Sequence, residues 1–237
     1  MTTVHRILVP FELPDADPVS PGIVETLASV EVVVLGRYGL PEQTPPSVAR
    51  SQYEAEMQME LEELAGPFES AARSVTTRLI FGHDRGKAID RAAVEEDCDV
   101  ILTPGQTDAV EELFVPLRGK ENLDRIVSFV GELLSVTDAS VTLFHAGEES
   151  DRLSGEKILS DATERLVEAG VDPDRITQQL SEDEVEQSIA DREDAFDLLV
   201  FGETEPSLRD RVFGTVPAQV TADMDSPAFV VRNSEQI

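Results

Sequence analysis

Short apolar runs rich in β-branched residues recur along the chain, and residues that favour turns border each of them. In the first half the runs are Ile7–Phe11, Val32–Leu35 and Asp99–Leu102. Apolar runs of this length without polar alternation are typical of strands buried on both faces of a parallel sheet. The pattern therefore predicts a sheet covered on both sides.

The same order of runs returns in the second half of the chain. Leu113–Leu117, Val141–Phe144 and Asp197–Val200 match the three earlier runs in order and nearly in spacing. Three matching runs in the same order in both halves of the chain indicate two tandem copies of one structural unit. The predicted domains are residues 1–111 and 112–237.

Helical patterns lie between the apolar runs. Gly170 follows the pattern at 158–169 in the position of a helix C-terminal glycine. Pro67 should kink or end the helix that begins with the pattern at 53–64. Strands that alternate with helices indicate β–α–β units and a parallel sheet. Apolar residues at helical spacing predict helices at 53–64, 123–134 and 158–169.

The two copies end differently. The second continues through a predicted helix at 215–224 and a last strand at 228–231. The first has only a short connection before Leu113, so it lacks an equivalent helix and strand. Ligands of open parallel sheets bind beyond the carboxyl ends of the strands. We therefore expect the second copy to carry the binding site and the first to be structural.

The charge narrows the classes of partner. Asp and Glu number 48 against 19 Lys and Arg, which gives a net charge of −29. Such a surface disfavours nucleic acid and anionic membranes, both of which bind basic patches. Only three of the basic residues are lysines, a composition typical of salt-loaded cytoplasms, where salt screens self-repulsion. Val, Leu, Ile and Phe exceed the ~20% below which disorder is expected, so a packed core can form.

The sequence gives little support to disulfide, metal or membrane chemistry. Cys98 is the only cysteine, and its acidic neighbours disfavour a thiolate, so we expect a buried thiol. His5, His83 and His145 lack the spacing of metal ligands, so no metal site is expected. No apolar stretch is long enough to insert into a membrane and no signal-peptide pattern is present, which predicts a cytoplasmic protein.

The second copy resembles the universal stress protein family at both of its ends. Leu113–Leu117 is similar to the family's opening strand, and Val200-Phe201-Gly202 is similar to the start of its glycine loop. Gly214-Thr215-Val216 resembles the end of that loop, and Ser226–Val231 resembles the closing strand. Together with the acidic composition, this resemblance implies a tandem member of haloarchaeal type.

The resemblance implies an α/β fold. It consists of two tandem Rossmann-like, parallel-sheet domains of the adenine nucleotide alpha hydrolase-like kind, packed as a pseudo-dimer within one chain. The first domain lacks its last helix and strand.

In the ATP-binding branch of the family, an aspartate after the first strand lies at the adenosine moiety, and loop glycines with a hydroxyl hold the phosphates. Glycines let backbone N–H groups approach phosphate, and the following helix presents its positive end. The resemblance therefore implies nucleotide-binding positions at Gly202, Gly214 and Thr215, with Arg118 at the aspartate position.

The match to that site is partial. Glu205 stands at the second loop glycine, and the interval to the next glycine is one residue short. Arg118 and Glu12 replace the aspartate in the second and first copies, and Pro104 removes an N–H donor from the first copy's loop. The departures indicate a degenerate pocket, in which Arg118 either helps to hold another anion or pairs with neighbouring acids.

These features favour one interpretation and leave two alternatives. The first is a universal stress protein that acts in the stress response by binding and not by catalysis, with ATP as the candidate cofactor. An alternative is an ATP or AMP sensor that uses the four positions above. Another is a soluble interaction module that regulates a membrane transporter, which an open apolar sheet edge on the first copy would favour. Each is compatible with a homo-oligomer or a protein partner.

Overall fold

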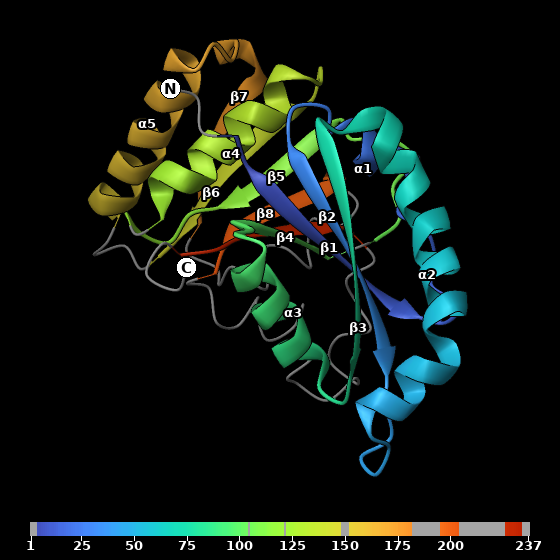
Figure 1. Cartoon of the computed structure of the whole chain (residues 1–237). Helices are drawn as coiled ribbons and strands as arrows, with labels where there is room; N and C mark the ends of the chain where they lie inside the picture. The colour runs from blue at the N-terminus through green and yellow to red at the C-terminus, as the bar shows by residue number, and fades with distance from the viewer. Residues whose placement is uncertain are drawn as a thin grey trace.

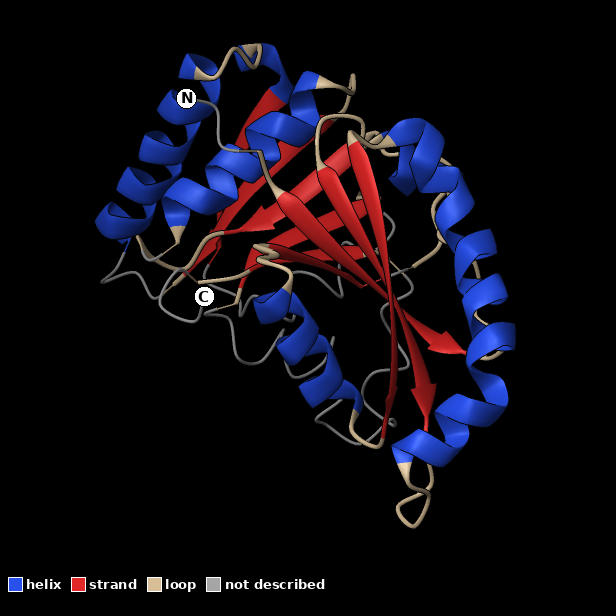
Figure 2. Ribbon diagram, viewed as in Figure 1, coloured by secondary structure: helices blue, strands red, loops and turns tan. Residues whose placement is uncertain are grey.

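The computed structural model describes residues 4–103, 105–120, 122–147, 152–181, 195–203 and 226–233 of the 237-residue chain. Within these residues the strands form one nine-stranded sheet, and helices cover it (Figures 1 and 2). The strands are β1 (Arg6–Leu13), β2 (Glu31–Gly39), β3 (Ser74–Gly82), β4 (Val100–Thr103), β5 (Glu112–Pro116), β6 (Ser140–Ala146), β7 (Ile176–Ser181), β8 (Leu198–Gly202) and β9 (Ala228–Val231). The helices are α1 (Pro21–Glu25), α2 (Pro46–Ala71), α3 (Arg85–Glu95), α4 (Leu123–Ser135), α5 (Arg152–Glu168) and the 3-10 helix η2 (Pro173–Arg175).

The strand order repeats in the two halves of the sheet. The complete order is β3-β2-β1-β4-β9-β8-β5-β6-β7. The block β3-β2-β1-β4 lies on one side of β9, and the equivalent block lies on the other side in reverse order, as β8-β5-β6-β7. Within each block the neighbouring strands are parallel. The predicted α/β architecture with Rossmann-like parallel units is therefore confirmed.

The two blocks are joined into one mixed sheet by β9. This strand is parallel to β8 but antiparallel to β4, with Val231 opposite Val100 and Ala228 opposite Thr103. The expectation that the first copy leaves a sheet edge open is therefore wrong at β4. An unpaired edge would leave backbone N–H and C=O groups without partners, and β9 supplies those partners from the other half of the chain.

Alternate residues of each strand face opposite sides of the sheet. Ile7 and Val9 belong to a large apolar core that extends over both halves, beneath α1, α2, α4 and α5. Leu8 points to the other side, into a smaller cluster beneath α3. A third cluster, on the second half, contains Phe114 and Phe201. Because the large core is continuous, the two halves share their main source of hydrophobic stabilisation.

Two of the predicted helix ends can be compared with the structure. Gly170 has a φ of +98°, which is the left-handed backbone expected at a C-terminal glycine. The helix predicted at 53–64 does not end at Pro67 but runs as α2 to Ala71. Pro67 removes one hydrogen bond of the helix ladder, but only about one turn of α2 follows it, and buried Phe68 anchors that turn. The helix predicted at 215–224 lies outside the described residues.

Candidate ligand site at the carboxyl ends of the strands

The order of the strands places a crevice in the first half of the sheet. From β1 the chain moves outward to β2 and then β3, and it returns through α3 to β4 on the opposite side of β1. The carboxyl ends of β1 and β4 therefore diverge at a topological switch point. This is where ligands bind in open α/β sheets.

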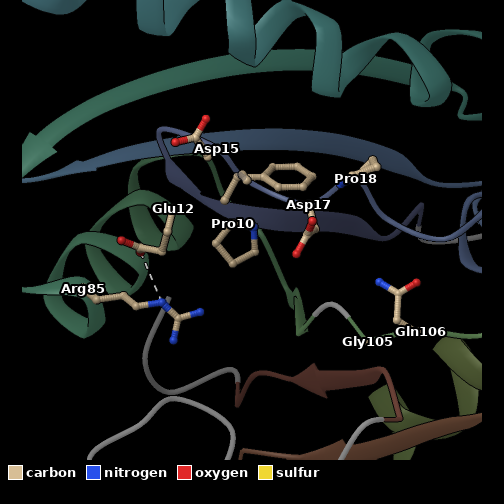
Figure 3. Close-up of a pocket in the computed structure, with 10 residues that line it drawn as sticks. Pro10, Glu12, Asp15, Asp17, Pro18, Arg85, Gly105 and Gln106 are labelled. Carbon is tan, nitrogen blue, oxygen red and sulfur yellow. Dashed lines mark hydrogen bonds and ion pairs between the residues drawn. The ribbon is translucent and has the colours of Figure 1, made fainter.

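A cavity of about 370 Å³ lies at this switch point (Figure 3). Residues of β1, of the loop after it, of the start of α3 and of the segment after β4 line it. The residues labelled in the figure are Pro10, Glu12, Asp15, Asp17, Pro18, Arg85, Gly105 and Gln106. The volume lies within the range typical of small-molecule sites.

Glu12 is the most constrained acidic group of the cavity. Arg37, which is only 7% exposed, donates from Nη1 to Glu12 Oε2. Arg85 Nε donates to the other carboxylate oxygen of Glu12 over 3.2 Å. Arg37 is itself fixed, because its Nη2 donates to the carbonyls of Gly82 and His83 over 3.1 and 2.8 Å. The carboxylate of Glu12 is thus held in place by two arginines from different elements.

The remaining charges of the cavity are negative. Asp15 and Asp17 line it from the loop after β1, and Arg85 is the one cationic side chain among the described lining residues. Carboxylates repel a polyphosphate by Coulomb interaction, whereas they accept hydrogen bonds from hydroxyl or amino groups. Pro10, Phe11 and Pro18 add an apolar wall. The arrangement suits a ligand with an apolar ring and hydroxyl or amino donors.

The segment after β4 closes one side of the cavity because it is pinned to α1. Thr107 donates its N–H to Ser20 Oγ over 3.3 Å. A Cβ added at Gly22 would lie 2.9 Å from the backbone of Asp108 and Ala109. Glycine at position 22 therefore permits the close approach of α1 and the segment after β4, which places Gly105 and Gln106 at the carboxyl end of β1.

The structure brings together two of the four predicted site residues in the second half. Gly202 is the last residue of β8 and is buried, and Arg118 follows β5 and is exposed. Because β5 and β8 are parallel neighbours, both residues lie at the switch point of that half. Gly214 and Thr215, like Glu205, lie outside the described residues.

The expectation that the first copy is only structural overlooked this cavity. The signal that could have located it was Glu12, which keeps a carboxylate where the second copy has Arg118. The sequence does not show that Arg37 and Arg85 converge on that carboxylate, because they come from β2 and α3.

Two of the histidines have structural contacts. His145 is buried and its Nδ1 lies 2.6 Å from the carbonyl of Leu117, and His83 Nδ1 lies 3.2 Å from the carbonyl of Leu40. Across the residues that the structure describes, no group of three or more His, Cys, Asp or Glu side chains could hold a metal ion. In the same residues, no helix is long and apolar enough to cross a membrane.

Comparison with solved structures identifies the fold. The chain superposes on a universal stress protein from Archaeoglobus fulgidus DSM 4304 with a TM-score of 0.65 and 14% identity, covering 98% of this chain and 97% of that one. It also superposes on a protein assigned as a universal stress protein from Pseudomonas aeruginosa UCBPP-PA14, with a TM-score of 0.54 and 12% identity, covering 99% and 95% of the two chains. No family model and no curated protein matches the sequence. At these identities the likeness establishes the universal stress protein fold.

Proposed function

We propose that this chain is a universal-stress-type protein that acts in the stress response by binding a small molecule, without catalytic turnover. The observation that carries the proposal is the cavity between the carboxyl ends of β1 and β4, where two arginines hold Glu12 in place. A carboxylate that is fixed before a ligand arrives loses little entropy on binding, which favours recognition.

The ligand that this cavity fits best is a nucleoside without a polyphosphate. The family resemblance puts an acidic residue at the adenosine end of the ligand, and Glu12 stands at that position. A ribose diol can donate hydrogen bonds to a carboxylate, and a flat base can pack against Pro10 and Phe11. Asp15 and Asp17 would repel the phosphates of ATP.

An ATP or AMP sensor in the second half is the alternative. It is supported by the adjacency of Gly202 and Arg118 at the second switch point, where a cation could attract a phosphate. The interaction-module alternative loses the open edge at β4 that would have supported it, because β9 occupies this edge.

Titration calorimetry in molar KCl with adenosine, AMP and ATP tests the proposal. We expect adenosine to bind more tightly than ATP. Glu12→Gln should weaken adenosine binding by about 10-fold or more, because a hydrogen bond to a charged group contributes ~1.5–3 kcal/mol. Glu56→Gln is the matched control: it makes the same charge change on the exposed face of α2 and should leave the affinity unchanged.

Other outcomes would separate the alternatives. Tighter binding of ATP than of adenosine, lost in Thr215→Ala and kept in Glu12→Gln, would overturn the proposal in favour of the second-half sensor. An absence of binding by all three ligands would overturn it in favour of the interaction module.

A further inference from the structure

A hydrogen-bonded Asp–His–Ser chain lies at the opposite end of the sheet from the cavity. His5 precedes β1 and Asp99 precedes β4, so both lie at the amino ends of adjacent strands, and Ser128 lies on α4. His5 Nδ1 contacts Asp99 Oδ2, and His5 Nε2 lies 3.1 Å from Ser128 Oγ. Figure 1 shows the start of β1 beside α4. The three side chains meet only because the first half of the chain packs on the second.

The partners of the imidazole define its tautomer. An ionised carboxylate only accepts hydrogen bonds, so His5 Nδ1 carries the proton that is donated to Asp99. Asp99 is fixed in turn, since its Oδ1 accepts the N–H of Arg6 over 2.7 Å. In neutral His5 the other ring nitrogen, Nε2, is then the acceptor, and the hydroxyl of Ser128 is its donor. The base is oriented by a third group, which is the arrangement that activates serine nucleophiles.

Burial protects the base and leaves the nucleophile accessible. His5 is 2% exposed and Asp99 is 8% exposed, whereas Ser128 is exposed. The ring of His5 also packs edge-on against Phe129, with the centroids 5.3 Å apart. A second carboxylate also lies near the imidazole: Glu132 Oε2 is 4.0 Å from His5 Nε2. Burial raises the pKa of the Glu132 carboxyl.

We propose that Ser128 is an activated nucleophile that accepts an acyl group from an activated ester, with His5 as its general base and Asp99 as the residue that positions His5. Ser128 Oγ forms a bond to the ester carbonyl carbon while its proton passes to His5 Nε2. The carbon–oxygen bond to the leaving group then breaks, and the leaving oxygen departs with the bonding electrons and takes the proton from Nε2. The product is acyl-Ser128 and the free alcohol or phenol.

The same geometry predicts a stoichiometric reaction. Ser128 lies inside α4, where backbone N–H groups are bonded to carbonyls one turn earlier. The local backbone therefore supplies no oxyanion hole, which is the largest source of rate in acyl-transfer enzymes. Acylation once per chain is consistent with a protein that otherwise acts by binding, and it does not depend on the cavity at the other end of the sheet.

The full-length protein in molar KCl, treated with p-nitrophenyl acetate, provides the test. Mass spectrometry of peptides locates the acetyl group, and the released p-nitrophenolate gives the rate. Ser135 is an internal control on the same helix: it is exposed, and its hydroxyl donates to the carbonyl of Glu132 over 2.7 Å instead of to a histidine. We expect Ser128 to be acetylated on the order of 100-fold faster than Ser135, the range that a positioned general base supplies.

Variants then assign the roles. Ser128→Ala should abolish the fast release of p-nitrophenolate, and Ser135→Ala should leave it unchanged. Asp99→Asn should slow the acetylation of Ser128 and move the proton of His5 from Nδ1 to Nε2 in ¹⁵N NMR, a change that loss of packing alone would not produce. Equal labelling of Ser128 and Ser135 in the wild-type protein, or acetylation of lysines alone, would overturn the proposal whether or not the variants fold.

Discussion

Cys98 lies beneath α3 with none of its residue surface exposed, packed in the cluster that contains Leu8, Val33 and Ile89. Burial is the main cause that raises the pKa of its thiol to about 12. Near neutral pH the group is therefore protonated and shielded, which agrees with the expectation of a buried thiol. The thiolate is the reactive form of cysteine, so the native protein should be inert to thiol reagents.

We predict that Ellman's reagent releases no thionitrobenzoate from the native protein at pH 8 in molar KCl. Addition of guanidinium chloride should release one equivalent, because unfolding removes the burial that raises the pKa. Fast release from the folded protein would show that Cys98 is open to solvent and would contradict this packing.

At the scale of elements, two glycine-to-alanine substitutions form a matched pair. Gly22 lies in the contact between α1 and the segment after β4, and Gly66 lies inside α2. Gly22→Ala places a methyl group 2.9 Å from backbone atoms of Asp108 and Ala109, so overpacking should destabilise the protein by about 1–3 kcal/mol. Gly66→Ala adds a methyl group inside α2 with nothing within 4 Å, and should stabilise it by about 0.5–1 kcal/mol. Urea unfolding at constant KCl measures both. Equal effects would contradict the close approach at Gly22.

The elements with a uniform apolar pattern could be predicted from sequence. The strand predicted at 228–231 is β9, and the helix predicted at 123–134 is α4. In contrast, no apolar run revealed β3 or β7, because both are edge strands of the sheet and polar, half-exposed residues occupy much of their length. Sequence patterns report burial, and these strands are stabilised by pairing with β2 and β6.

At the scale of the whole molecule, the candidate site could be predicted only in part. A parallel sheet predicts that ligands bind beyond the carboxyl ends of its strands. The sequence pattern, however, assigns the site to the second half and marks Glu12 only as a departure from the family's aspartate. The cavity itself depends on long-range convergence, because Arg37, Arg85 and Gln106 come from different parts of the chain. The pairing of β4 with β9 is equally non-local, and no local pattern encodes it.

Because the net charge is −29, the stability of the whole molecule should depend on the salt concentration. Lowering KCl from about 1 M to about 0.1 M lengthens the Debye length from ~3 Å to ~10 Å, which exposes the surface carboxylates to one another. We predict that the melting temperature falls over this range, measured by circular dichroism at constant pH. An unchanged or higher melting temperature at low salt would contradict the prediction that the protein is adapted to high salt.

The central claim is that the cleft between β1 and β4 binds a nucleoside through Glu12. A crystal structure of the full-length protein grown with adenosine in molar KCl tests this most directly. The account predicts density for the base against Pro10 and Phe11, with the ribose hydroxyls at the Glu12 carboxylate. Adenosine bound instead beyond Gly202 in the second half, with an empty cleft at Glu12, would contradict it.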